Sequence, residues 1–356
     1  MLFFRGDSRM IKQLIRWVEQ GKLPDSVVRM GIRRLIKQRL AEEHANHVEL
    51  CDQKYHDFLQ EIKQSAVAID TDKANEQHYE VDAEFYQYAL GKRRKYSSAY
   101  YHPNDTLDQA EENMLAMYLE RGQFENGQDI LELGCGWGSL TLYLAEQLPD
   151  SKITGVSNSH SQRQYIMAQA KQRGFENIKI ITCDINDLQL EEDFDRIISI
   201  EMFEHVRNYQ SLFNAIADWL RPTGKLFVHV FAHRFLMYPF IADGDDNWMA
   251  EHFFSGGQMP AVDTFYHFQE RLKIERRWLN SGQHYEKTAN HWLENLDANH
   301  NQAMPVLERV YGDEAELWMQ RWRIFFMSCA ELFGYDNGNQ WLVAHYLFSL
   351  NNKQHG

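Results

Sequence analysis

The sequence predicts an α/β protein built on a doubly wound, mostly parallel sheet. The first observation is a series of short apolar runs between residues 128 and 230, alternating with stretches long enough for helices. The second is a glycine-rich loop directly after the first of these runs. Strands separated by helices of this length form right-handed crossover units, which cover both faces of a parallel sheet.

Seven strands are expected along the chain. Five of them alternate with helices, at residues 130–133, 153–156, 178–181, 196–200 and 225–230. The segment Leu220-Arg221-Pro222-Thr223-Gly224 is expected to close the helix before the fifth strand. After residue 242 the pattern loosens. There we expect a helix and a strand within 263–280, helices over 286–333 and a final strand over 341–350.

The first hundred residues are expected to be helical. Ile11, Leu14, Ile15 and Val18 form one apolar helix face, and residues 23–26 break the helix and start a second one. The second helix also carries five basic residues, Arg29, Arg33, Arg34, Lys37 and Arg39. Such a helix can rest on an anionic membrane, but a solvated charged face is the commoner case. We therefore divide the chain into a helical cap (1–100), a core (101–240) and a region of pocket loops and helices with the last strands (241–356).

Composition limits the classes of function. The 356 residues are 44% hydrophobic and 13% aromatic, which favours a globular protein, and the net charge of −14 disfavours nucleic-acid binding and suits a cationic ligand. The four cysteines match no zinc spacing, and His44 and His47 lack a third ligand, so we expect reduced thiols and no metal site. The opening residues MLFFRGDSRM carry no signal-peptide core, which favours a cytoplasmic protein. A homodimer remains open.

The sharpest motif is the loop of Gly134, Gly136 and Gly138, which follows the first strand of the core. Glycines at alternate positions allow a tight turn and a close approach by a ligand, and the next helix points its N–H groups there. The spacing is G-x-G-x-G, which differs from the dinucleotide pattern G-x-G-x-x-G. We therefore expect an adenosine-containing ligand; a purely structural turn is the alternative.

Polar residues follow the next two strands of the core. Ser157 and Asn158 end the second strand, and Gln162 lies one turn into the following helix. Uncharged polar groups at this strand end can bind ribose hydroxyls, since an acidic residue does so roughly 20 residues after a dinucleotide loop. Asp184 and Ile185 follow the third strand, where the carboxylate can accept a hydrogen bond from an adenine amino group. Taken singly, such residues often only cap helices.

The motifs LELGCGWGSL, GVSNSHSQ, CDI and EMFEHVRNY occur in the order found in S-adenosylmethionine-dependent methyltransferases. The chain resembles the branch that contains cyclopropane fatty acid synthases and the plant coclaurine and pavine N-methyltransferases, over nearly its whole length. The resemblance implies a Rossmann-like class I fold, S-adenosyl-L-methionine as cofactor and methyl transfer to a small, alkaloid-like amine. It also implies that Tyr96 and Ser97 fold over the methionine end of the cofactor. The full expected cofactor set is Tyr96, Ser97, Glu132, Gly134, Gly136, Gly138, Ser157, Asn158, Gln162, Asp184 and Ile185.

An amine acceptor requires a proton acceptor. An aliphatic amine with a pKa near 10 is mostly protonated at neutral pH and lacks the lone pair that attacks. Glu201, Glu204 and His205 follow the fourth strand, where acidic residues can also simply begin a helix. By resemblance, Glu204 and His205 are the acid/base pair, Glu201 assists them and Glu80 contacts the amine. We expect His205 to accept the proton, because an imidazole pKa near 6.5 is closest to the working pH.

The substrate is less certain than the family. Trp137, Phe203 and later aromatic residues are candidates for a wall that binds a cation, although core packing explains each one singly. The alternative is a lipid enzyme that modifies unsaturated acyl chains, because His229 falls where its relatives hold bicarbonate. Against it, residues 324–326 offer no tyrosine to complete that site. A binding protein without catalysis is a third interpretation, which the intact E-x-x-E-H segment disfavours.

Overall fold

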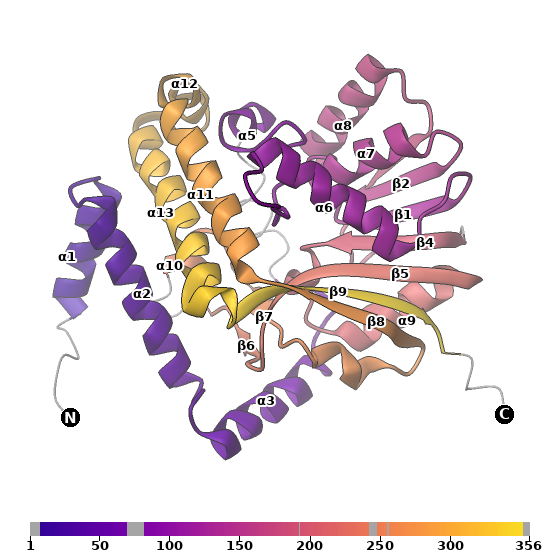
Figure 1. Ribbon diagram of the computed structural model, residues 1–356, viewed down its shortest axis with the longest axis horizontal. Coiled ribbons are helices and arrows are strands. Elements are labelled where there is room, and N and C mark those ends of the chain that lie inside the picture. The colour runs from indigo at the N-terminus through magenta and orange to yellow at the C-terminus, as the bar shows by residue number, and fades with distance from the viewer. Residues whose placement is uncertain (1–7, 70–81, 192, 242–247, 255, 352–356) are drawn as a thin grey trace.

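The computed structural model describes residues 8–69, 82–191, 193–241, 248–254 and 256–351 (Figure 1). A seven-stranded sheet in the order β3-β2-β1-β4-β5-β9-β8 forms the centre of the molecule. Neighbouring strands among β1 to β5 run parallel, and β9 pairs antiparallel with both β5 and β8. The predicted doubly wound, mostly parallel fold is therefore confirmed. The strands are β1 (Asp129–Leu133), β2 (Lys152–Ser157), β3 (Ile178–Thr182), β4 (Phe194–Ile200), β5 (Leu220–His233), β8 (Leu272–Asn280) and β9 (Trp341–Leu350).

Helices cover both faces of the sheet. On one face, α6 (Leu107–Gly122), α7 (Ser139–Gln147) and α8 (His160–Arg173) pack on inward residues such as Ile130. On the other face, α3 (Val48–Ile62) and α9 (Tyr209–Trp219) pack on residues such as Leu131. Neighbouring strand residues thus bury opposite sides, as the two-residue period of a strand requires. Runs that are continuously apolar suit strands buried on both faces.

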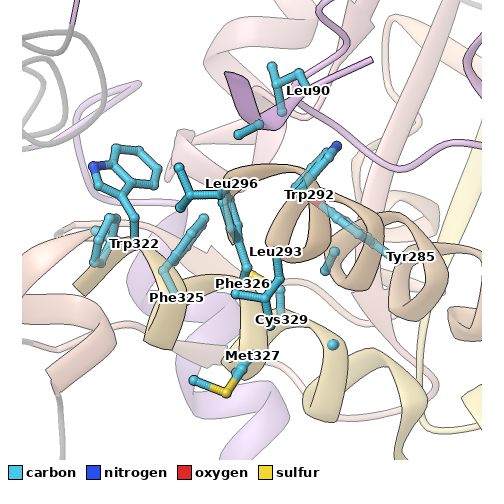
Figure 2. Packing of buried hydrophobic residues seen from close by; sticks show 14 of the residues in the cluster. Leu90, Tyr285, Trp292, Leu293, Leu296, Trp322, Phe325, Phe326, Met327 and Cys329 are labelled. Carbon is cyan, nitrogen blue, oxygen red and sulfur yellow. The ribbon is translucent and has the colours of Figure 1, made fainter. Parts of the chain in front are cut away.

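The C-terminal helices form a second layer of packing beside the sheet. The region predicted to be helical over 286–333 contains α11 (Gly282–Ala298), α12 (His300–Tyr311) and α13 (Ala315–Gly334). Figure 2 shows Leu296 of α11 beside Trp322 and Phe325 of α13 in a buried cluster, and Trp292 of α11 packs on Phe326 of α13 with ring centroids 5.6 Å apart. The helix α5 (Ala83–Ala89) contributes Phe85 to the same cluster. These large apolar side chains fix the helices beside the carboxyl ends of β4 and β5.

Two local predictions need adjustment. The helix α9 ends at Trp219 with Leu220 as its C-cap residue, as expected, but the segment 220–224 already belongs to β5, which begins at Leu220 and not at residue 225. Within 263–280 the expected helix is the short 3-10 turn η2 (Thr264–Phe268), followed by β8. Short elements also connect β5 to η2, namely β6 (Tyr238–Pro239), α10 (Trp248–His252) and β7 (Gln258–Met259).

The basic second helix, α2 (Asp25–Glu42), follows α1 (Ser8–Glu19) and packs along α13. Its Arg29 and Arg33 form ion pairs with Glu331 at 3.0 and 2.9 Å, and Arg39 pairs with Glu43 at 3.4 Å. Three of the five basic residues of this helix are therefore paired with acidic residues of the protein, two of them across the contact with α13. Within the described ranges, no helix combines the length and apolar character needed to cross a bilayer. That the basic face of α2 is solvated, and does not bind a membrane surface, stays a prediction.

The histidines and cysteines singled out in the sequence have other surroundings. His47 caps α3, since its Nδ1 accepts a hydrogen bond from the Leu50 N–H at 3.4 Å, and His44 is exposed. All four cysteines are free thiols. Among the residues placed by the structure, no group of three His, Cys, Asp or Glu side chains is arranged to hold a metal ion.

Candidate active site

The glycine loop turns the chain from β1 into α7. Gly134, Gly136 and Gly138 have φ values of +79°, +50° and +77°, a region that L side chains rarely adopt. A Cβ on Gly134 would lie 2.9 Å from Met202, and one on Gly138 would lie 2.6 Å from Ile166. A Cβ on Gly136 would meet nothing within 4 Å. Gly134 and Gly138 therefore permit tight packing of the loop on its neighbours, and the space beside Gly136 is open.

A cavity opens in front of this loop, at the carboxyl ends of β1 and β4. Open α/β sheets bind ligands at this edge. The cavity is lined by Arg94, Lys95, Tyr96, Ser97, Leu115, Tyr118, Glu132, Gly134, Cys135, Gly136, Trp137, Ser139, Leu140, Ile200, Glu201, His205, Phe231, Phe254, Tyr285, Trp292 and Phe325.

The predicted site residues fall into three groups relative to this cavity. Those that line it are Tyr96, Ser97, Glu132, Gly134, Gly136, Glu201 and His205. Those that are not among the lining residues are Gly138, Ser157, Asn158, Gln162, Asp184, Ile185 and Glu204. Glu80 lies outside the described residues. Segments that are far apart in the chain thus meet at the cavity, whose lining includes Tyr96, Glu132, Glu201 and Tyr285.

The polar residues after β2 and β3 lie side by side, because these strands are neighbours. The Ser157 hydroxyl donates a hydrogen bond to Gln162 Oε1 at 2.6 Å. The Cys183 N–H donates to the Ser157 carbonyl at 3.0 Å. Asp184 accepts hydrogen bonds at Oδ1 from the Asn186 N–H and side-chain amide, which fixes its carboxylate at the strand end. This edge therefore offers a fixed carboxylate and amide beside the glycine loop.

Three buried hydrogen-bond donors near the loop test whether the residues fit a cofactor. Gln162 Nε2, Trp137 Nε1 and Ser139 Oγ are each buried and have no hydrogen-bond partner among the residues described. Buried polar groups are rarely left unpaired in native proteins, so such a cluster indicates a missing partner. A nucleoside with an amino-acid tail supplies hydroxyl, ring-nitrogen and carboxylate acceptors. The residues present therefore fit S-adenosylmethionine.

Glu132 lies under the loop and is almost completely buried. Its Oε2 accepts a hydrogen bond from the Thr141 hydroxyl at 2.5 Å. Burial raises the pKa of the Glu132 carboxyl to about 8, against the smaller opposing effect of the Thr141 bond. Without a cationic partner this carboxyl is therefore mostly protonated at neutral pH.

Glu201 begins the opposite, carboxylate end of the cavity. It follows β4 with φ +47°, a left-handed conformation that turns its side chain away from the strand direction. Oε1 accepts hydrogen bonds from the Ser98 N–H at 2.9 Å and lies 3.0 Å from His229 Nε2, and Oε2 accepts from the Tyr285 hydroxyl at 2.7 Å. Burial raises the pKa of Glu201, while the Lys95 cation lowers it. Both oxygens are thus held by neighbours from three different segments.

Glu204 lies in the 3-10 turn η1 (Phe203–His205) and is completely buried. Its Oε1 accepts the Phe231 N–H at 2.7 Å, and its Oε2 has no hydrogen-bond partner within the described ranges. Burial raises the pKa of Glu204 well above its usual value, and the nearby Glu201 charge adds to the shift. An unpaired carboxyl oxygen in this environment requires either a proton or a cation.

His205 lies on the cavity wall, stacked on Phe254 with ring centroids 5.0 Å apart. Burial lowers the pKa of His205 to about 4, although Glu201 opposes the shift. Burial therefore holds the pKa of His205 below the value near 6.5 that the sequence suggests. The physical reason is desolvation, which disfavours the imidazolium form. The neutral ring has a lone pair at neutral pH, but it is a weaker base than assumed.

Sequence reasoning missed Lys95 and Tyr285. Lys95 is buried on the cavity wall, and its Nζ donates to Ser97 Oγ at 2.5 Å and to the Ser98 carbonyl at 2.7 Å. Burial lowers the pKa of Lys95 to about 8, while Glu201 and Glu111 favour its charged form. A lysine directly before the Tyr96-Ser97 pair was an available signal. Tyr285 offered none, because it reaches Glu201 from α11 across 84 positions of sequence.

Aromatic side chains form much of the wall, as expected, but with one correction. Tyr96, Trp137 and Phe254 face the cavity. Phe203 does not, because it is buried in the other face of the sheet against Tyr209, with ring centroids 6.1 Å apart. In the turn η1, only every third or fourth residue can point in the same direction. Phe203 therefore stabilises the core beneath the site.

Together, the fold and the cavity define an S-adenosylmethionine-dependent methyltransferase. Residues 67–341 match the mycolic acid cyclopropane synthetase family. The chain belongs to this family.

Relatives of the chain include enzymes that are N-methyltransferases by name and enzymes that modify phospholipid acyl chains. The chain is 33% identical to (S)-coclaurine N-methyltransferase from Thalictrum flavum subsp. glaucum, covering 95% of this chain and 96% of the relative. It is 29% identical to the Escherichia coli (strain K12) cyclopropane-fatty-acyl-phospholipid synthase over 75% of this chain and 66% of that enzyme. A crystal structure of a coclaurine N-methyltransferase bound to N-methylheliamine and SAH superposes with a TM-score of 0.92, at 33% identity, covering 96% of this chain and 99% of that one. Over nearly its whole length the chain is thus similar to enzymes that are N-methyltransferases by name.

Proposed function

We propose that this enzyme methylates the nitrogen of a small amine of the tetrahydroisoquinoline type, and that the carboxylate end of the cavity receives it as a cation. The observation that carries this proposal is the buried Glu204 oxygen, which lacks a partner among the described residues. A protonated amine supplies both the hydrogen bond and the charge that this oxygen requires. The names of the relatives support the same substrate class, since they include coclaurine and pavine N-methyltransferases.

The charges around the cavity support a cationic rather than an anionic substrate. Glu201 has its own cation in Lys95, which is fully buried beside it. Among the residues that the structure describes, no basic side chain contributes to the pKa shift of Glu204, and the charge of Glu201 acts against its ionisation. An arriving ammonium group therefore neutralises Glu204 and lowers its pKa, so that amine binding and ionisation of Glu204 favour each other.

The proposed roles divide the proton transfer among the three residues. Glu204 binds the ammonium group, and His205 accepts the proton that must leave before the nitrogen can attack. His205 is suited to this because its imidazole is neutral when the amine arrives. The nearby carboxylate charge of Glu204 then favours the imidazolium form. Glu201 maintains negative charge at the wall, and Glu80 is proposed as a further contact to the amine.

The proposed cofactor contacts follow from the cavity and its neighbours. We assign the loop Gly134–Gly138 and the wall residues Tyr96, Ser97 and Glu132 to the methionine part, and the strand-end residues Ser157, Asn158, Gln162, Asp184 and Ile185 to the ribose and adenine. When bound, S-adenosylmethionine supplies an activated methyl group on a positively charged sulfur. The protein mainly has to orient the amine nitrogen, exclude water and remove the proton.

The wall of aromatic rings supports the same conclusion. Tyr96, Trp137 and Trp292 lie around the cavity, and Tyr96 packs on Trp292 with ring centroids 5.6 Å apart. Aromatic faces stabilise a methylated ammonium product through cation–π interaction without forming a hydrogen bond to it. This property matters because each methylation removes one N–H donor from the nitrogen.

The lipid alternative has less support from the site. His229, which would bind bicarbonate in that alternative, has its Nε2 directed at Glu201 at 3.0 Å. Phe325, from the segment expected to supply a tyrosine, brings only an apolar ring to the cavity. The lipid proposal would require His229 to leave Glu201 and a tyrosine that this segment lacks, whereas the amine proposal requires neither.

The remaining predictions concern the whole molecule. We propose that residues 1–100 form a cap over the core of residues 101–240, and that 241–356 complete the pocket. The packing of α2 on α13 supports this division, since it joins the cap to the pocket helices. We also propose a cytoplasmic enzyme that acts on a dissolved amine, without nucleic acid, and leave a homodimer as a testable state.

The test is methyl transfer from labelled cofactor. The purified enzyme is incubated with a panel of tetrahydroisoquinolines and, in parallel, with vesicles of unsaturated phosphatidylethanolamine and phosphatidylglycerol, each with and without bicarbonate. We expect label in the amines, independent of bicarbonate. Label in the lipid alone, or a requirement for bicarbonate, would contradict the proposal. Label in neither would do so as well, provided that the enzyme binds the cofactor.

A further inference from the structure

A chain of buried polar groups leads away from the cavity at Glu201. Antiparallel pairing of β5 with β9 places His229 directly opposite His345, and both are completely buried. His345 Nε2 lies 2.9 Å from His229 Nδ1. At the far end, Arg121 Nη1 lies 2.8 Å from His345 Nδ1. Arg121 is only partly buried, so the chain runs from the edge of the protein to the active site.

Arg121 restricts the direction of the hydrogen bonds that His345 makes. A guanidinium group can only donate, so His345 Nδ1 must carry a lone pair. A neutral His345 then carries its proton on Nε2. His229 Nδ1 is the acceptor within reach, because the Asn280 amide nitrogen, 3.3 Å from Nε2, is itself a donor. His229 in turn carries its proton on Nε2 and donates it to Glu201 Oε1 at 3.0 Å.

Both histidines stay neutral in this arrangement. Burial lowers the pKa of His229 and of His345 well below the usual value, and the charges of Arg121 and Lys95 add to both shifts. The Tyr118 hydroxyl also lies 2.9 Å from His229 Nδ1, and as a donor it favours the same tautomer. The groups that face Glu201 are then Lys95, His205, Glu204, Tyr285, the Ser98 N–H and His229.

We propose that Arg121, His345 and His229 form a directed positioning relay, in which the distant guanidinium selects the histidine tautomers that orient the catalytic-site carboxylate of Glu201. None of the three reaches the substrate directly through this chain, so each acts through Glu201. With the opposite tautomer, His229 would present a lone pair to the carboxylate, which repels it. The positioning role rests on the proposed function of Glu201. The assignment of the tautomers does not depend on that function.

The first test reads the tautomers without any turnover. In nitrogen-15 spectra of the histidine-labelled full chain, assigned with the substitutions His229→Gln and His345→Gln, we expect Nε2 protonated and Nδ1 unprotonated in both rings. A protonated Nδ1 on either ring would overturn the relay. This result is independent of which substrate the enzyme methylates, so it separates failure of the relay from failure of the proposed function.

The second test removes the guanidinium. In Arg121→Met we expect both His345 tautomers to appear, and turnover to fall roughly tenfold, because a wrong tautomer disables an otherwise intact site. Cofactor affinity and amine KM should change far less, and Arg121→Lys, which keeps a charged donor, should restore most of the turnover.

A matched control separates the relay from a general loss of charge. Arg276 stacks on the same ring as Arg121, with guanidinium carbons 4.8 and 5.3 Å from the Trp278 ring centroid, but it is exposed and makes no hydrogen bond to His345. Arg276→Met should leave tautomers and turnover unchanged. Equal losses in Arg121→Met and Arg276→Met, or unchanged tautomers in Arg121→Met, would overturn the proposal.

Discussion

The glycine end of the cavity and its carboxylate end are held by different kinds of structure. The glycine end uses one continuous segment, in which three positive φ values turn the backbone between β1 and α7. The carboxylate end joins Glu201 to Ser98, His229 and Tyr285, which lie on three other segments. One end is thus a local backbone shape, and the other depends on the whole fold.

This difference separates binding from chemistry. The glycine loop leaves donors and open space for a neutral or anionic part of a ligand, which suits cofactor binding. The carboxylate end concentrates buried acids whose pKa values are raised, which suits a cation and the movement of a proton. Changes at one end should therefore affect affinity for the cofactor, and changes at the other should affect turnover.

The largest effect is expected at Glu204. The substitution Glu204→Gln keeps the volume and an oxygen that can accept the Phe231 N–H, but it removes the charge that binds the amine. We expect turnover to fall about 100-fold or more, as for loss of a general acid–base group. Cofactor affinity, measured by calorimetry, should stay within about threefold, since no cofactor contact is assigned to Glu204. A collapse of cofactor binding would show that the two ends are not separable.

His205 gives the second test of the carboxylate end. His205→Ala removes the proposed proton acceptor, and we expect turnover to fall about 100-fold while cofactor affinity stays nearly unchanged. The loss should shrink at high pH, where more of the amine is already deprotonated in solution. A loss that is the same at all pH values would argue that His205 positions the amine and accepts no proton.

The glycine end is tested by Gly138→Ala. The added Cβ would lie 2.6 Å from Ile166 at a φ of +77°, so it should shift the loop and cost about 2–4 kcal/mol of stability from strain and overpacking. Cofactor affinity should fall about tenfold, and turnover at saturating cofactor should change less.

The control for Gly138 is Gly174→Ala. Gly174 has a similar φ of +73°, but a Cβ there would meet nothing within 4 Å. It should show the strain alone, about 1–2 kcal/mol, with unchanged cofactor affinity. If both variants weakened the cofactor equally, the loop geometry at Gly138 would not be the cause.

The substitution of Glu132 is expected to change stability rather than activity. Its pKa is raised from an ordinary value of 4.5 to about 8 by burial, so the folded protein retains a proton that the unfolded chain loses. Stability should therefore fall as the pH rises from about 4.5 to 8, by up to about 1.4 kcal/mol per pH unit from this group. Urea unfolding of Glu132→Gln should lack this part of the slope. The exposed control Glu120→Gln should keep it.

The smallest effect is expected on the basic face of α2. The double substitution Arg34→Gln and Lys37→Gln removes two exposed charges far from the cavity lining. Amine methylation should change by less than about twofold, in keeping with the small effect of surface substitutions. Sedimentation with anionic vesicles tests the membrane prediction. Loss of vesicle binding in this variant would show that the face serves a lipid surface.

The sequence predicts the glycine end better because its determinants are local. Alternate glycines, a preceding apolar strand and a following helix lie within about a dozen residues, and the structure places them as expected. The strand over 341–350 was also correctly predicted, because it is mostly apolar, with eight apolar residues beside His345 and Ser349. The helix end near Leu220 was correctly predicted, but the start of β5 lies at Leu220 and not at residue 225, since one proline and one glycine suit the start of a strand as well as the end of a helix.

The carboxylate end was only partly predictable. Glu201, Glu204 and His205 form a recognisable segment, but their pKa values depend on burial that no short window reveals. Lys95 and Tyr285 belong to the site through tertiary packing, as does His345 through the register of β9 on β5. The role of Phe203 was misjudged. In a 3-10 turn, residues next to each other point in different directions, so a shift of one residue changes which side chain faces the cavity.

The central claim is that a substrate cation ionises Glu204, and a permanent cation tests it most directly. An N,N-dimethyltetrahydroisoquinolinium ion cannot release a proton itself, so calorimetry near neutral pH in buffers of different ionisation enthalpy counts protons released by the protein. We predict release of about one proton per ion bound in the wild type, and almost none in Glu204→Gln. Binding of the ion without proton release in the wild type would contradict the account.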